Sequence, residues 1–154
     1  KARQMRSYIN NFTLNKNCFK VSVSNQVSML PDLFNFSEKK LSFPPDGVLI
    51  NSEIEHYLDI RFENKLVGFY KITDLCFDNT IELHGSFAKA DSFLIRGYFE
   101  LTKLFVLKVS NDWPKFTIKS MVNKSHFKVQ NFLKYLNFEI EKFEGDYIVF
   151  RLND

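Results

Sequence analysis

The chain has 154 residues, about one average domain, of which 45% are apolar and 25% charged. This balance excludes a disordered tail, because it leaves enough apolar side chains for a packed core. A net charge of +3 is too small to indicate a nucleic-acid partner, and no apolar run is long enough for a membrane helix. Cys18 and Cys76 have neither metal-ligand spacing nor a disulfide framework, so we expect a reducing, cytoplasmic setting.

The N-terminal third is weakly patterned. Residues 5–9 are compatible with one or two helical turns, and the alternation over 18–24 predicts a short strand. Residues 31–40 are compatible with a short helix, and residues 44–47, Pro-Pro-Asp-Gly, predict a turn. Whether the first 50 residues cover an acceptor site stays open.

The centre of the chain predicts a three-stranded antiparallel meander. Residues 57–63 alternate between apolar and polar, residues 66–73 run back after a short turn, and residues 80–87 alternate again. In this third strand Glu82 and His84 share one side, because side chains two residues apart point the same way.

In the last third of the chain, the spacing of the apolar residues changes from that of a strand to that of a helix. Apolar residues recur at three and four positions over 93–109, which predicts a long helix that Asp91 or Ser92 caps. A β-branched strand over 116–122, an amphipathic helix around 129–136 and a closing hairpin over 138–152 follow. The chain is therefore expected to form one α+β domain over residues 1–154.

Catalytic motifs of hydrolases, phosphate-loop enzymes and dinucleotide-binding enzymes are absent from the sequence. The three histidines are His56, His84 and His126, and their spacing indicates no metal site.

The order of meander, long helix, strand, helix and hairpin over residues 57–152 resembles the GNAT superfamily of N-acetyltransferases. The segment from Val122 to Phe138 carries the resemblance most clearly, with Asn137 where the family has a glycine after its last helix. The resemblance implies a GNAT-like fold, with a mixed, mainly antiparallel twisted sheet of six to seven strands and about four helices. The strands at 80–87 and 116–122 should be parallel neighbours that splay into a cleft.

The resemblance also implies an acetyl-CoA site at the start of the long helix, where backbone N–H groups bind the pyrophosphate. Residues 94–99 match the family's phosphate motif at Gly97, whereas Phe99 replaces a small residue and Leu94 replaces Arg or Gln. Arg96 is the nearby cation. The alternative is an ordinary helix in which Gly97 permits close packing. The expected cofactor-binding residues are Phe87, Ala88, Arg96, Gly97, Tyr98, Phe99 and His126.

Glu82 and His84 are the candidate catalytic bases, because the family often carries a general base on this strand. The alternative for Glu82 is a solvated surface carboxylate. The tyrosine that often serves the family as a general acid falls at Leu133 and is absent.

The leading functional hypothesis is transfer of an acetyl group from acetyl-CoA to a primary amine, on a protein or a small molecule. Two rivals stay open: a non-catalytic GNAT-like structural or interaction protein, and a binding domain that keeps the cofactor only structurally. The sequence also resembles bacteriophage members of the superfamily through Asn123-Lys124-Ser125-His126. A phage protein would lie in the host cytoplasm or the virion, with viral structural proteins or further copies of itself as partners.

Overall fold

A computed structural model describes residues 2–24, 54–87 and 91–154. The expected helix over 31–40, the expected turn at 44–47 and Ala88 lie outside these residues. Contacts between Cα atoms divide the chain into two compact units. The first unit comprises residues 1–74 and 84–90, and the second comprises residues 75–83 and 91–154. The expectation of a single domain stays a prediction.

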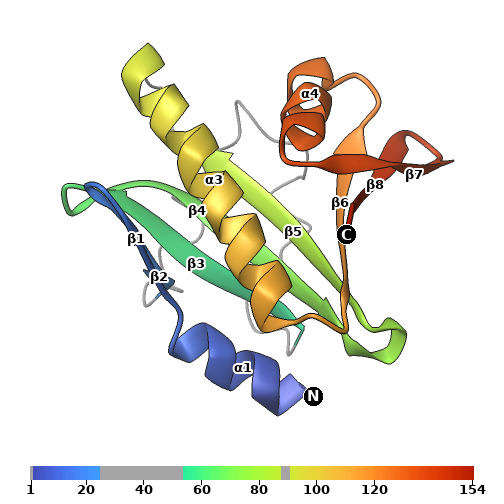
Figure 1. The fold of residues 1–154 in the computed structure, drawn as a ribbon, viewed down its shortest axis with the longest axis horizontal. Coiled ribbons are helices and arrows are strands. Elements are labelled where there is room, and N and C mark those ends of the chain that lie inside the picture. Colours follow the sequence, from blue (N-terminus) through green and yellow to red (C-terminus); the bar gives the residue numbers. More distant parts are fainter. Residues whose placement is uncertain (1, 25–53, 88–90) are drawn as a thin grey trace. The chain divides into compact units, whose positions relative to one another are not determined.

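The elements follow the predicted order (Figure 1). The helices and the short 3-10 turn η3 are α1 (Ala2–Asn10), η3 (Cys76–Asp78), α3 (Ser92–Asp112) and α4 (Phe127–Tyr135). The strands are β1 (Thr13–Lys16), β2 (Phe19–Val23), β3 (Glu55–Phe62), β4 (Lys65–Leu75), β5 (Thr80–Phe87), β6 (Thr117–Asn123), β7 (Phe138–Glu144) and β8 (Tyr147–Leu152).

Eight strands form a mixed sheet in the order β1-β2-β3-β4-β5-β6-β8-β7. The sequence predicted six or seven strands, and the additional strand is β1. Its four residues contain one apolar side chain, so no alternation marks it, and its pairing with β2 defines it instead. The expected α+β class and GNAT-like order are confirmed.

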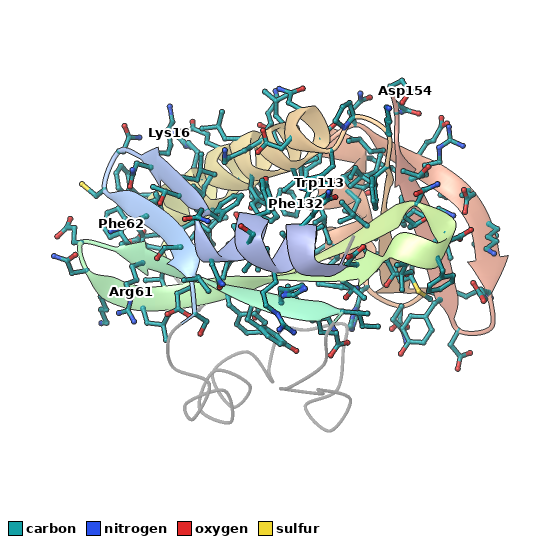
Figure 2. All side chains as sticks on the ribbon, turned by 90° about the horizontal axis from the view of Figure 1, so that it is seen from below. Lys16, Arg61, Phe62, Trp113, Phe132 and Asp154 are labelled. Carbon is teal, nitrogen blue, oxygen red and sulfur yellow. The ribbon has the colours of Figure 1, made fainter. Side chains whose placement is uncertain are left out.

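In the first unit, β3 and β4 form a hairpin whose two loop residues, Glu63 and Asn64, have φ values of 49° and 66°. Positive φ at both central positions gives the turn that matches the twist of paired strands. Ile60 pairs with Gly68 and Arg61 with Leu66, so β4 carries one extra residue, a β-bulge, at Val67. Arg61 and Phe62 are the last two residues of β3 before the loop of this hairpin (Figure 2).

Apolar side chains are buried on both faces of β3 and β4, as the consecutive buried residues Tyr57 and Leu58 on β3 and Phe69 and Tyr70 on β4 show. Phe19 packs on Phe62 with ring centroids 4.8 Å apart, and Val21 pairs with Ile60. α1 contacts β2 and β3 and buries Met5 and Ile9. Residues 5–9, which are compatible with one or two helical turns from the sequence, thus belong to the longer helix α1.

In the second unit, α3 buries the apolar stripe that its period predicts. Leu101, Phe105 and Val109 are at most 1% exposed. The helix ends before Trp113, whose N–H donates to the carbonyl of Val109. β8 pairs antiparallel with both β6 and β7, which reverses the last two strands relative to chain order.

Asn137 ends the turn after α4 with a φ of 72°, the left-handed conformation expected from its place in the family pattern. Its N–H donates to the carbonyl of Lys134. Asn tolerates this conformation better than most residues because its short polar side chain bonds locally, so the swap from glycine is confirmed as structurally sound.

Candidate functional site

The parallel pair that the resemblance implies lies in the second unit. β5 pairs with β6 through Thr80↔Thr117, Ile81↔Ile118 and Glu82↔Lys119. No register pair joins residues 83–87 of β5 to residues 120–123 of β6. The two strands are therefore parallel neighbours, as predicted, and their backbone ladder is confined to the first three residues.

Ser120 forms a hydrogen bond to β5 just after the last backbone pair of β5 and β6. Its hydroxyl donates to the carbonyl of Leu83 at 2.8 Å, and the Ser120 residue is 6% exposed. A side chain thus satisfies a buried carbonyl that the ladder no longer reaches. Nothing in the sequence marks Ser120 as such a residue, because a serine in a β-branched strand gives no signal of its partner.

Glu82 occupies the last pair of this ladder and is half-buried. Its register partner Lys119 forms an ion pair with Glu141 of β7, with Nζ 2.9 Å from Oε2. The two side chains of that pair are 20% and 27% exposed, so the pair is partly shielded from water. The candidate base thus lies next to Lys119, whose ammonium group is paired with Glu141.

His84 and Phe87 belong to the first unit, on the second half of β5, and both are half-buried. Phe87 meets Tyr70 edge to face, with ring centroids 5.8 Å apart. A Cβ added at Gly68 would overlap the carbonyl oxygen of Ser86, so β4 approaches β5 closely here.

The N-terminus of α3 is capped by Asp91, as the sequence predicts. Oδ1 of Asp91 accepts from the N–H of Leu94 at 3.0 Å, and the Asp91 carbonyl accepts the first helical bond from Ile95. The helix starts at Ser92, so Gly97 lies in its second turn. The N–H of Gly97 is therefore part of the helix ladder rather than open at its end.

The first turn of α3, rather than Gly97, offers donors for a pyrophosphate. The N–H groups of Ser92 and Phe93 have no acceptor inside the helix, and the first turn holds no acidic residue. Arg96 is exposed one turn further on. The carboxylate of Asp91 opposes an anion here, whereas the two N–H groups and the nearby Arg96 attract one. The residues therefore fit a pyrophosphate at the start of α3.

Tyr98 and Phe99 turn in different directions from α3. Tyr98 is 3% exposed, and burial, with a smaller contribution from the charge of Asp91, raises the pKa of its hydroxyl. Phe99 stacks on Phe132 of α4, with centroids 4.7 Å apart and planes inclined by 23°. The Phe99 ring thus lies against Phe132 of α4, and its role in cofactor binding stays a prediction.

His126 is the N-cap residue of α4, but its side chain makes no capping hydrogen bond. The preceding turn is held by Asn123, whose Oδ1 accepts from the N–H and the hydroxyl of Ser125. Nδ1 of His126 is buried without a hydrogen-bond partner. The role of His126 in cofactor binding stays a prediction.

The predicted site residues are divided between the two units. The second unit holds Glu82, Arg96, Gly97, Tyr98, Phe99 and His126, and the first holds His84 and Phe87. Residues 2–24, 54–87 and 91–154 contain no group of three or more His, Cys, Asp or Glu side chains that could hold a metal ion. Within the same ranges, no helix has both the length and the apolar character to span a membrane.

Solved structures identify the fold. The chain matches the PaiA N-acetyltransferase of Thermoplasma acidophilum in complex with coenzyme A with a TM-score of 0.65 and 13% identity, over 88% of this chain and 99% of that one. It matches the ribosomal-protein-S5-alanine acetyltransferase of Vibrio fischeri with a TM-score of 0.65 and 11% identity, over 94% and 98%.

A third likeness is to RimL, the ribosomal L7/L12 alpha-N-protein acetyltransferase, with a TM-score of 0.65 and 11% identity over 91% of both chains. No protein-family model matches the sequence, and no sequence among the curated proteins matches it. The chain therefore has the fold of the GNAT acetyltransferases.

Proposed function

We propose that the chain is a GNAT-type N-acyltransferase that moves an acetyl group from acetyl-CoA to a primary amine. The observation that carries the proposal is the parallel β5–β6 ladder that stops after Glu82↔Lys119, in a chain with the GNAT fold. The resemblance to GNAT enzymes implies that the acyl donor lies beyond the last pair of this ladder. A neighbour of the same fold was solved with coenzyme A, which supports this donor.

The N–H groups of Ser92 and Phe93 would hold the pyrophosphate, and Arg96 would add a charge-assisted contact. This places the donor's phosphates one turn before Gly97. When bound, the donor supplies a thioester carbonyl that an amine can attack.

Glu82 is the proposed general base. It takes a proton from the amine, whose nitrogen attacks the carbonyl directly, so that a C–N bond forms, the C–S bond breaks and the thiolate leaves. The resemblance implies that backbone N–H groups near Phe87 stabilise the negative oxygen of the transition state, and this role stays a prediction because Phe87 belongs to the first unit. His84, two residues further along β5, is the alternative base.

Substitution of Glu82 tests its role as the general base. Glu82→Gln keeps the shape of the side chain but removes its proton affinity, so turnover at neutral pH should fall at least about tenfold while CoA binding is retained. The measurement is release of free CoA with a panel of primary amines. Glu139→Gln, at an exposed position on β7, is the matched control and should keep full turnover. Unchanged turnover in Glu82→Gln would move the role to His84 or to water.

A non-catalytic GNAT-like structural or interaction protein is the second candidate. The capping carboxylate of Asp91 and the enclosure of Gly97 within the helix favour it. This candidate predicts no turnover and no CoA binding by the wild-type protein. Phage origin and viral structural partners remain predictions from the sequence.

A further inference from the structure

Ser120 places a hydroxyl among apolar side chains in the second unit. It shares the buried side of β6 with Ile118 and Val122, and its register partner on β8 is Phe150. All four residues are at most 6% exposed. A hydroxyl removed from water costs free energy unless it forms a hydrogen bond, whereas an alanine or a valine would only pack here. The serine is therefore explained by its hydrogen bond to the carbonyl of Leu83, 2.8 Å away, and not by packing.

This hydrogen bond ties β5 to a strand that is itself held on its other side. β6 lies between β5 and β8 in the sheet, and residues 119–123 of β6 all pair with β8 (Figure 1). The backbone ladder between β6 and β5 ends at Glu82. The Ser120 hydroxyl then donates to the carbonyl of Leu83, a residue that is 5% exposed. Ser120 therefore holds the backbone of β5 immediately after Glu82, where the ladder no longer does.

We infer that Ser120 is a positioning residue for Glu82. The inference rests on the proposed function, in which Glu82 takes a proton from the acceptor amine. A general base must lie within about 2.6–3.2 Å of the atom that carries the proton, and a displacement of about 1 Å can slow a reaction about 100-fold. Glu82 and Leu83 share one stretch of backbone, so movement of the Leu83 carbonyl displaces the Glu82 carboxylate. The hydroxyl of Ser120 prevents that movement without touching the substrate.

Removal of the hydroxyl tests this role. Ser120→Ala should lower turnover, measured as release of free CoA, by about 10- to 100-fold, while the dissociation constant of CoA in calorimetry stays within about threefold of wild type. Ser120→Thr keeps the hydroxyl and should keep turnover within about threefold of wild type. The matched control is Thr80→Val, because the Thr80 hydroxyl also donates to a backbone carbonyl, that of Asp78 at 3.1 Å, but at the paired start of β5. This control should keep full turnover.

A double variant separates positioning from a general loss of structure. If Ser120 acts through Glu82, Ser120→Ala combined with Glu82→Gln should turn over about as fast as Glu82→Gln alone, because no base is left to position. A merely structural role for Ser120 would instead make the two losses multiply.

Several results would overturn the inference. If Ser120→Ala turns over within about twofold of the wild type, or if the losses multiply in the double variant, Ser120 does not position the base, and the proposed function stands. If Ser120→Thr is as slow as Ser120→Ala, the effect belongs to packing and not to the hydroxyl. If the wild type neither turns over nor binds CoA, both proposals fail. Should Ser120→Ala fail to fold by circular dichroism, Ser120→Cys decides, because its thiol is a weak donor of similar size, and turnover should again fall about tenfold or more.

Discussion

The most specific prediction about the fold concerns the substitution Gly68→Ala. A Cβ added there would overlap the carbonyl oxygen of Ser86 and lie 3.1 Å from Cα of Phe87 and 3.2 Å from the carbonyl carbon of Ser86. All three atoms are backbone atoms of β5, so no side-chain rotation can relieve the contact. In Gly68→Ala, β4 must move away from β5 and weaken the hydrogen bonds between them.

Overpacking of this kind costs about 1–3 kcal/mol, and the backbone contact puts Gly68→Ala near about 3 kcal/mol. For a chain of this size, that free energy lowers the melting temperature by about 6–12 °C. The assay is thermal unfolding followed by circular dichroism. The control is Gly145→Asn, in the β7–β8 turn, where φ is 58° and no atom lies within 4 Å of an added Cβ. Asn tolerates this backbone, so the control should melt like the wild type.

A Gly68→Ala variant that melts within about 2 °C of the wild type would refute this reasoning, because β4 and β5 would then not approach as closely as described.

Three further predictions address the site and the termini of elements. Arg96→Ala should weaken CoA binding by about 1–2 kcal/mol in calorimetry, and an unchanged dissociation constant would remove Arg96 from the site. Asn137→Ala should lose about 1 kcal/mol in urea unfolding while Asn137→Gly keeps wild-type stability, because φ is 72° there; equal midpoints for all three would contradict the left-handed turn. Burial, and secondarily the charge of Glu55, raise the pKa of Tyr57 above its usual range. The unfolded chain then releases this proton above pH about 10 while the native chain keeps it, so stability should fall as pH rises through 10. Tyr57→Phe should lose less stability than the wild type between pH 9 and 11, and an equal loss would show that Tyr57 is not the group responsible.

Much of the fold was predictable because local chemistry and tertiary structure agree. The strand at 80–87 has the bounds that its alternation predicts, and the turn at Asn137 has the conformation that its residue type favours. β1 was not predictable, because its residues carry no apolar period and only pairing with β2 makes them a strand. The hydrogen bond from Ser120 to Leu83 joins residues 37 positions apart, which no local pattern encodes.

The candidate site was predictable in its parts but not in its geometry. The sequence predicts the Asp91 cap and the parallel pair of strands, and both are confirmed. It also matches Gly97 to a phosphate motif, but a helix that starts at Ser92 encloses that residue in its second turn. Phe99 stacks on Phe132, which lies 33 residues later in the chain. No local pattern in the sequence predicts this contact between α3 and α4.

Native mass spectrometry of the protein purified from cells tests the central claim most directly. An acyl-CoA-dependent transferase should retain CoA or acetyl-CoA, or bind it when acetyl-CoA is added, as a mass increment equal to one ligand per chain. No bound ligand, even with millimolar acetyl-CoA, would contradict the account and leave a GNAT fold without GNAT chemistry.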